Sequence, residues 1–388
     1  MFRKFNKAHI AHTPNAQVAG DAYNTVICPA DFAMAQAEIT AWQGYAPTPL
    51  YHLEALAAAL GLGEIHYKDE GPRFGLGSFK ALGGAYAGLR VLQRELNEDA
   101  TLADIRAGHH ATGVANITLA SATDGNHGRS LAWGAQRFGA PCQIYIHKDV
   151  SEGRAQAMRD LGAVVTRIDG DYDVSVEQIR RDAEAHGWFV VSDTSWEGYT
   201  QAPTDVMAGY GVMVHEIIQD LEQAPTHVFL QGGVGGLAAA VAAMLRQHWG
   251  TDAPRVVVVE PELAACLFDS AKAGALTHFS IIEETLMAGL SCGEPSGLAW
   301  EVLREQATDF MTIPESIVAP TMQILGRPLA GDSPITAGES AVAGLAGVIA
   351  AATGPLKKQL GLSASSRVLL IGSEGATDVE IYDQLMAQ

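Results

Sequence analysis

One lysine lies among glycines, and its surroundings point to covalent chemistry. Lys80 stands between Gly77 and Gly83, in the first turn of a helix predicted over residues 78–96. Glycines let a flat ligand approach the backbone, and the positive end of a helix dipole favours the neutral form of an amine. A neutral lysine amine is the nucleophile that forms a Schiff base with a carbonyl compound. Taken alone, such a lysine is more often a solvated surface residue.

A second candidate is the turn Ala-Thr-Asp-Gly-Asn-His-Gly-Arg at residues 122–129, directly after a predicted strand. Gly125 and Gly128 permit a tight turn into a helix predicted to begin at Asn126. The Asn126 amide can donate a hydrogen bond to a phenolate oxygen on a ring. By itself, a helix start capped by Asn or Asp explains the pattern equally well, and His127 is then a packed or capping histidine.

A third candidate is the glycine-rich turn between a predicted strand at 226–230 and a predicted helix at 237–248. Free backbone N–H groups at a helix N-terminus form a cradle suited to phosphate. The residues that would line this cradle are Gly232, Gly233, Val234, Gly235 and Gly236. The turn is not a Walker loop, and its third glycine is misplaced for a dinucleotide fingerprint. A tight turn without a ligand is the alternative.

Strands alternate with helices along the 388 residues, which predicts an α/β fold with parallel sheets flanked by helices. The runs Val256–Val259 and Val368–Ile371 are apolar on both faces, as buried parallel strands are. Ligands bind at the carboxyl ends of such strands, and the main motifs follow strand ends. The length predicts two domains.

The composition excludes several classes of partner. The formal net charge of −19 repels nucleic acid and anionic membranes, so neither is expected as a partner. The apolar stretches are shorter than the roughly 18 residues of a membrane span, and the N-terminus lacks the apolar core of a signal peptide. The cysteines show no zinc-finger spacing, so reduced thiols, a cytoplasmic protein and no metal site are expected. They are Cys28, Cys142, Cys266 and Cys292.

Together and in this order, the three motifs resemble those of the fold-type II pyridoxal 5′-phosphate (PLP) enzymes. That family includes serine and threonine dehydratases, threonine synthase and the tryptophan synthase β-subunit. The counterparts here are Ser78-Phe-Lys80 for the Schiff base, Thr123–Gly128 for the ring oxygen and Gly232–Gly236 for the phosphate. The resemblance covers nearly the whole chain. It implies PLP as the cofactor and a mainly parallel twisted sheet flanked by helices in each of two domains.

The same resemblance implies a divided large domain and a partner subunit. Residues 1–85 and 206–388 are expected to form the large PLP-binding domain, and residues 86–205 a small domain inserted between them. The family often forms homodimers, and a homodimer is expected. By the same analogy, Ser373 faces the pyridine nitrogen. A neutral hydroxyl there weakens the electron sink of the ring, which suits elimination of a β-substituent.

Longer motifs resemble the diaminopropionate ammonia-lyases within this family. The matching segments are Arg73–Ala87, Thr123–Arg129, Asp193–Tyr199, Met287–Pro295 and Ala337–Ser340. Gly77 and Ser78 stand where that group has Asn-Ala, and Ala337 stands where it has Ser. These departures concern substrate preference and leave the cofactor unaffected.

The resemblance implies two bases. Lys80 removes the Cα proton of one enantiomer, by family resemblance the L form, and Asp124 removes that of the D form. Asp193 and Thr123 are expected to bind the substrate, with Asp193 meeting a second ammonium group. A helix cap or a salt bridge is the alternative for Asp193.

The expected reaction is α,β-elimination of ammonia from 2,3-diaminopropionate, with both enantiomers accepted and pyruvate and ammonia formed. A serine- or threonine-type dehydratase is the main alternative, and Asp124 and the acidic segments Met287–Pro295 and Ala337–Ala341 argue against it. A nucleotide-binding regulatory protein would explain the glycine turns but not Lys80. A catalytically inactive relative is disfavoured by the intact Lys80, Asn126 and Ser373.

Overall fold

The computed structural model describes residues 2–16, 18–96, 99–123, 125–170 and 172–388. The chain divides into two compact units, each described here by itself. The first unit contains residues 1–29, 46–78 and 213–388, and the second contains residues 30–45 and 79–212. The predicted domains, 1–85 with 206–388 and 86–205, follow the split arrangement of the family that the motifs resemble, and this division stays a prediction.

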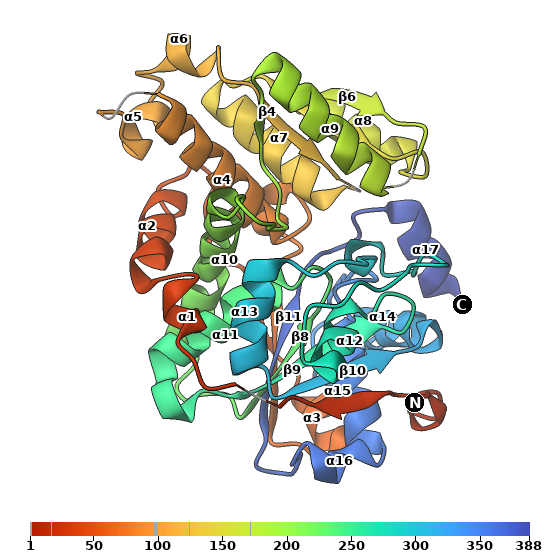
Figure 1. The fold of residues 1–388 in the computed structure, drawn as a ribbon. Coiled ribbons are helices and arrows are strands. Elements are labelled where there is room, and N and C mark those ends of the chain that lie inside the picture. Colours follow the sequence, from red (N-terminus) through yellow and green to blue (C-terminus); the bar gives the residue numbers. More distant parts are fainter. Residues whose placement is uncertain (1, 17, 97–98, 124, 171) are drawn as a thin grey trace. The chain divides into compact units, whose positions relative to one another are not determined.

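The first unit is built on a seven-stranded sheet (Figure 1). In spatial order its strands are β1 (His12–Pro14), β10 (Asp309–Ile313), β9 (Arg255–Pro261), β8 (His227–Gln231), β11 (Arg367–Gly372), β3 (Glu64–Asp69) and β2 (Leu50–His52). The five inner strands are parallel, and the edge strands β1 and β2 pair antiparallel to their neighbours. The carboxyl ends of the inner strands therefore lie along one edge of the sheet.

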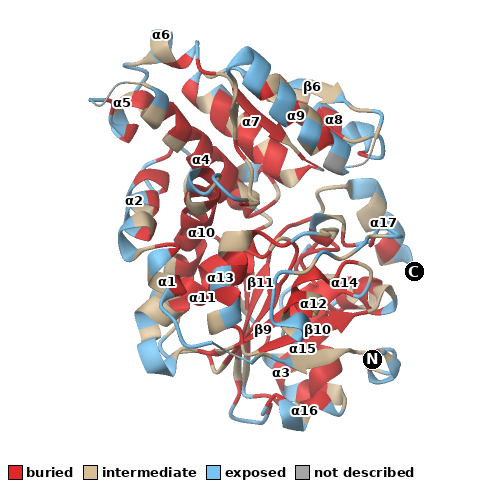
Figure 2. Cartoon of the chain, in the orientation of Figure 1, coloured by how far each residue is buried: buried red, intermediate tan, exposed pale blue. Residues whose placement is uncertain are grey.

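The inner strands of this sheet are buried (Figure 2). Val256–Val259 and Val368–Ile371 are at most 4% exposed, so the prediction of strands apolar on both faces is confirmed. The apolar helix α15 packs against β8, β9 and β10, and α11 packs against β8. The α-helices of this unit are α1 (Ala22–Thr25), α3 (Glu54–Leu60), α11 (Gly236–Trp249), α12 (Cys266–Ala273), α13 (Gly297–Gln306), α14 (Val318–Gly326), α15 (Ala343–Thr353), α16 (Leu356–Gln359) and α17 (Val379–Ala387). Its 3₁₀ helices are η1 (Phe5–Lys7), η2 (Arg73–Gly75), η3 (Gly250–Asp252), η4 (Ala288–Leu290) and η5 (Glu315–Ile317).

The second unit has a four-stranded parallel sheet. In spatial order its strands are β6 (Val164–Arg167), β5 (Cys142–Ile146), β4 (Leu119–Ala122) and β7 (Phe189–Val190). Its helices are α2 (Pro29–Ile39), α4 (Lys80–Glu95), α5 (Leu102–Arg106), α6 (Ala111–Val114), α7 (Asn126–Phe138), α8 (Glu152–Asp160) and α9 (Tyr172–His186). Helix α10 (Gln201–Asp220) begins in this unit and ends in the first.

The α/β prediction is confirmed, since both sheets are mainly parallel and flanked by helices. The helix predicted from Asn126 to Phe138 is observed over those residues, and the strand predicted at 255–260 is observed one residue longer. Among the described helices, none combines the length and the apolar character that a membrane span needs.

Candidate active site

Lys80 is the first residue of α4, and glycines hold that helix close to its neighbours. A Cβ atom on Gly83 would lie 2.5 Å from the ring of Tyr210 in α10, and one on Gly84 would lie 2.8 Å from Ser130 Oγ in α7. Ser130 Oγ also accepts a hydrogen bond of 3.0 Å from the backbone of α4. Helix α4 therefore packs against α7 and α10 at distances that no larger residue allows, and this packing fixes its N-terminal turn.

The structure brings Lys80 and Asp193 together. Asp193 follows β7, and its carboxylate accepts a hydrogen bond from Lys80 Nζ and forms an ion pair with it. Burial alone would raise the pKa of Asp193, but the charges of Lys80 and His127 outweigh burial and lower that pKa well below its usual range. Asp193 is therefore an anion directed at the candidate nucleophile. The salt bridge considered as an alternative for Asp193 exists, and its partner is Lys80.

His127 joins this pair from α7. Its Nε2 lies 2.9 Å from the carbonyl oxygen of Val191, and its Nδ1 lies 4.0 Å from Asp193 Oδ2. The ring is 5% exposed. The sequence predicted a packed or capping histidine, and the buried ring agrees with packing. Its contact with Val191, 64 residues away along the chain, could not be read from the local pattern.

Thr123 stabilises the turn that begins α7. Its hydroxyl accepts hydrogen bonds from the N–H groups of Gly125 at 3.1 Å and Gly128 at 3.2 Å. A Cβ atom on Gly128 would lie 2.3 Å from Thr123 Cγ2, so this position requires glycine. Asn126 begins the helix and is partly exposed, while Asp124 lies outside the described residues. Substrate binding by Thr123 and the ring-oxygen contact of Asn126 stay predictions.

Two aromatic rings lie beside the lysine. Lys80 Nζ is 5.4 Å from the centroid of the Phe79 ring and 6.0 Å from that of Tyr210, and the two rings are 4.6 Å apart. Burial raises the pKa of Tyr210, so its phenol stays neutral. Sequence reasoning missed Tyr210. The sequence feature that could have indicated it is the four-residue spacing between Val206 and Tyr210. This spacing places both side chains on one face of α10, and both lie against Gly83.

The glycine turn of the first unit connects β8 to α11. Gly233 and Gly235 have φ values of +64° and +95°, a conformation that favours glycine. The N–H of Gly232 bonds to Val259 O and that of Gly235 to Gly232 O. The N–H groups of Gly233, Val234 and Gly236 have no acceptor in the described part of the chain. They are available to an anion at the N-terminus of α11.

Glu260 lies beneath this turn. A Cβ atom on Gly232 would lie 2.3 Å from Glu260 Cγ. The carboxyl group accepts hydrogen bonds from the N–H groups of Leu267 at 3.0 Å and Phe268 at 2.7 Å. Burial raises the pKa of Glu260 to about 8 despite these bonds. Near neutral pH the group therefore opposes an anion in the turn less than an ordinary carboxylate would.

Gln231 connects the glycine turn to Ser373. Its Nε2 donates to Ile371 O at 2.6 Å and to Ala341 O at 3.0 Å, and lies 3.5 Å from Ser373 Oγ. Its Oε1 is buried and has no hydrogen-bond partner among the described residues. Because β8 and β11 are parallel neighbours, the residues after both strands share one edge of the sheet. Gln231 was missed by sequence reasoning, although it ends a strand directly before the glycines.

The two acidic segments lie in the same unit as the turn. A Cβ atom on Gly233 would lie 3.5 Å from Gly289 O and 3.8 Å from Cys292 Sγ. Ser340 Oγ accepts a bond of 3.1 Å from Gly289 N, and Ser340 N donates to Glu374 Oε1 at 3.2 Å. The glycine turn therefore packs against Met287–Pro295, which is bonded in turn to the loop that carries Ser340.

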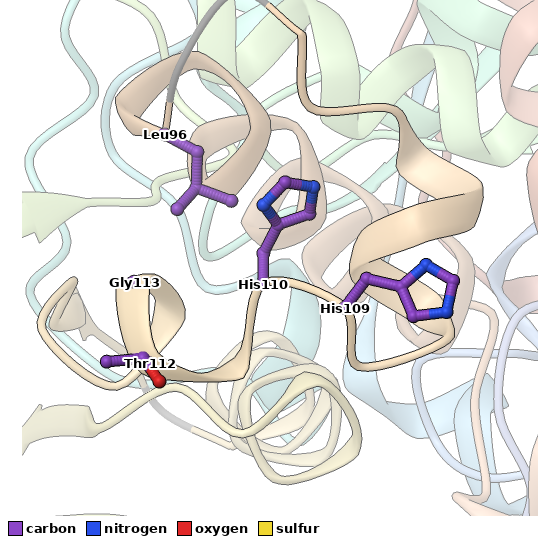
Figure 3. A pocket seen from close by; sticks show the side chains of 5 residues that line it. All are labelled: Leu96, His109, His110, Thr112 and Gly113. Atoms are coloured by element: carbon purple, nitrogen blue, oxygen red, sulfur yellow. The ribbon is translucent and has the colours of Figure 1, made fainter.

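The second unit also has a pocket whose lining differs from the surroundings of Lys80. It has a volume of about 370 Å³ and is lined by Leu96, His109, His110, Thr112 and Gly113 (Figure 3). His109 is exposed and pairs with Asp104 at 3.1 Å. None of its lining residues is a lysine or a carboxylate, so it offers fewer groups for catalysis than the surroundings of Lys80 do. Across the residues that the structure describes, no group of three His, Cys, Asp or Glu side chains is placed to hold a metal ion.

The described residues fit a phosphorylated aromatic aldehyde. Lys80 supplies an amine beside a carboxylate, the glycine turn supplies N–H groups without acceptors, and Ser373 supplies a hydroxyl at the sheet edge. Each of these groups suits one part of such a ligand, and the family match below shows a PLP-dependent enzyme. Residues 41–374 match the family described as pyridoxal-phosphate dependent enzyme, and the chain belongs to that family. PLP is its cofactor.

Within the family, the chain is similar to diaminopropionate ammonia-lyases. Diaminopropionate ammonia-lyase from Escherichia coli strain K12 is 40% identical over 351 residues, which cover 88% of each chain. The crystal structure of the E. coli diaminopropionate ammonia-lyase in complex with an aminoacrylate-PLP azomethine reaction intermediate matches with a TM-score of 0.89 and 36% identity, covering 98% of this chain and 97% of that one. The E. coli complex with D-serine matches with a TM-score of 0.90 and 36% identity, covering 97% of both chains.

Proposed function

We propose that this chain catalyses α,β-elimination of ammonia from 2,3-diaminopropionate and accepts both enantiomers. One diaminopropionate and one water give one pyruvate and two ammonia. The observation that carries the proposal is the ion pair between Lys80 and Asp193, which joins two of the long motifs shared with diaminopropionate ammonia-lyases. The 40% identity to the E. coli enzyme over 88% of both chains supports it.

The cofactor contacts follow from the chemistry of the described groups. PLP, when bound, draws electrons from Cα of the attached amino acid, so that a Cα proton and a β-substituent can leave. Lys80 attaches the cofactor covalently, and Gly232–Gly236 bind its phosphate through backbone N–H groups. Asn126 donates to the ring oxygen and Ser373 faces the ring nitrogen. The N–H groups of the turn that have no acceptor support the phosphate assignment.

The substrate is handled by two bases and one anchoring carboxylate. Lys80 takes the Cα proton of the L enantiomer and Asp124 that of the D enantiomer. Asp193 holds the ammonium group at Cβ, with Thr123 also on the substrate side. The lowered pKa of Asp193 supports this role, because a carboxylate that stays ionised attracts a cationic amine more strongly than a hydroxyl group.

We infer that the protein is a cytoplasmic homodimer whose PLP-binding domain is formed by residues 1–85 and 206–388, with a small domain at 86–205. The four cysteines form no disulfide among the described residues, which supports a reducing compartment. Compact units that change at residues 78/79 and 212/213 support the domain division, while residues 30–45 group with the second unit. Size-exclusion chromatography with light scattering tests the dimer, and a mass of about 41 kDa, that of one chain, would reject it.

The proposed reaction is tested by spectroscopy followed by turnover. The purified protein is expected to absorb visible light through bound PLP. Addition of either enantiomer of 2,3-diaminopropionate is expected to release pyruvate. A protein that stays colourless after incubation with PLP would contradict the proposal.

A serine dehydratase is the second candidate, because a probable D-serine dehydratase from Shouchella clausii is 26% identical over 294 residues. D- and L-serine in the same assay distinguish the two. Faster pyruvate release from serine than from diaminopropionate would favour the dehydratase.

A further inference from the structure

The two ring nitrogens of His127 have different surroundings. Nε2 lies 2.9 Å from Val191 O, and because a carbonyl oxygen only accepts, Nε2 must carry a hydrogen. Nδ1 is buried and has no hydrogen-bond partner among the described residues. The backbone therefore fixes one proton of the ring, and the state of Nδ1 depends on what it faces.

Nδ1 faces the carboxylate of Asp193. The distance to Asp193 Oδ2 is 4.0 Å, which is within ion-pair range but longer than a hydrogen bond. A bare Nδ1 would direct a lone pair at an anion, and this arrangement is repulsive. A protonated Nδ1 would direct positive charge at the anion, and burial strengthens that attraction because water screens it less.

Two groups that can carry a positive charge lie near Asp193, Lys80 and His127, and Lys80 loses its charge during the proposed reaction. Lys80 loses its ammonium charge whenever its amine acts as a nucleophile or a base. At those stages Asp193 would be a buried anion without Lys80 as its counter-ion. His127 is the other ionisable residue within ion-pair range of Asp193, with Nδ1 4.0 Å from Oδ2.

We propose that His127 is a positioning residue for Asp193, with its ring protonated on both nitrogens. Nε2–H binds Val191 O, and Nδ1–H compensates the carboxylate while Lys80 is uncharged. The inference rests on the proposed function only in so far as Asp193 is the residue that holds the substrate ammonium. The protonation itself is independent of any substrate.

The two tyrosines near Asp193 cannot supply the compensating positive charge. Tyr210 comes from α10 and Tyr199 follows β7, and burial raises the pKa of both phenols, so both stay neutral. The Tyr199 hydroxyl donates to Val190 O at 2.8 Å and accepts from Ser192 N at 3.0 Å. It thereby fixes the strand end that carries Val191 and Asp193.

Further charges lie around Tyr199 and His127. Arg94 and Arg180 act on Tyr199, and Arg180 also stacks on Trp196 at 3.6 Å. Asp124, three residues before His127, lies outside the described residues.

Nitrogen-15 NMR of the histidine rings tests the proposal directly. Protein labelled at histidine is measured without cofactor and with PLP at pH 7.5, and His127→Gln identifies the signal. We expect the pattern of a doubly protonated ring in both states, and its replacement by the neutral Nε2–H form in Asp193→Asn. A neutral His127 ring in the PLP-loaded wild-type protein would overturn the proposal.

The absorbance of bound PLP gives a second measurement. In His127→Gln the Gln amide can still donate to Val191 O but carries no charge. Loss of that charge favours protonation at Lys80 Nζ. The midpoint of the pH-dependent change in visible absorbance should therefore rise by about one unit, a tenfold change in proton binding. His147→Gln, in the same unit beside Asp149, is the matched control and should leave the midpoint unchanged. An unchanged midpoint in His127→Gln would count against the proposal.

Different results would contradict the proposed reaction and the proposed role of His127. Wild-type protein that releases pyruvate from diaminopropionate but has a neutral His127 keeps the proposed reaction and loses the positioning role. A doubly protonated His127 in a protein that releases no pyruvate keeps the protonation state and rejects the reaction.

Discussion

A buried charge cluster in the first unit gives a prediction of large effect on stability. It consists of Lys68, Glu70, Arg73 and Glu216, which are 0%, 0%, 1% and 4% exposed. Glu216 Oε2 lies 2.7 Å from Lys68 Nζ and 2.7 Å from Arg73 Nη2. Arg73 also donates two hydrogen bonds of 2.8 Å to Glu70. The two positive and two negative charges cancel inside the protein.

Glu216→Gln leaves this cluster with one uncompensated positive charge. Removing one partner of a buried ion pair costs about 3–5 kcal/mol, so the free energy of unfolding of the first unit should fall by that amount. Urea unfolding of the full chain, followed by circular dichroism at pH 7.5, measures the change. Glu152→Gln is the matched control. Glu152 pairs with Arg159 and Arg167 but is 69% exposed, so water screens these pairs and the free energy of unfolding should fall far less than in Glu216→Gln.

A double variant separates charge from packing. Lys68→Met combined with Glu216→Gln restores neutrality and should recover part of the stability lost in Glu216→Gln alone. A Glu216→Gln protein that unfolds no earlier than Glu152→Gln would refute the reasoning.

The pH dependence gives a further check on Glu216. Burial would raise the pKa of Glu216, but the hydrogen bonds and charges of Arg73 and Lys68 lower it. A lowered folded pKa contributes stability that is complete above the unfolded value of about 4.3 and is lost as pH falls through the folded value. The difference between wild type and Glu216→Gln should therefore shrink below about pH 4.

Three other variants address the site. Lys80→Ala should abolish the visible absorbance of covalently bound PLP, and a protein that kept it would show that another residue is attached. Asp124→Asn should lower turnover of D-2,3-diaminopropionate by roughly 100-fold or more while affecting the L enantiomer less, and equal losses in the two assays would remove the two-base mechanism. Gly232→Ala places a methyl group against Glu260 and should cost about 1–3 kcal/mol in thermal unfolding and weaken PLP binding in a fluorescence titration. Gly153→Ala, where no atom lies within 4 Å, is its control, and equal behaviour of the two would contradict the close approach.

Local patterns in the sequence predicted much of the fold. The helix from Asn126 was predicted from its glycine turn, and the strand at β9 from its run of valines. The three-residue edge strand β1 was not predicted, because a strand that short has no periodicity to detect and depends on pairing with β10. Apolar helix α15 was also missed, since uniform apolar character gives no helical stripe.

The residues of the candidate site were likewise predicted only in part. Lys80 and the glycine turn were predicted from local motifs. The ion pair of Lys80 with Asp193 joins residues 113 positions apart, and the buried bond between Arg73 and Glu216 spans 143 positions. No local pattern encodes such partners, because they arise only when the helices and strands pack. Tyr210 was missed for this reason, and the partners of His127 could not be predicted.

The amide of Gln231 joins backbone that lies 110 and 140 residues away, at Ala341 and Ile371. The glycine turn that follows it is therefore shaped by contacts that exist only after most of the first unit has folded. A ligand that binds such a turn and not the unfolded chain stabilises the folded state by mass action. Cofactor uptake during refolding should accordingly lag behind helix formation. The growth of PLP absorbance would then report when the first unit completes its folding.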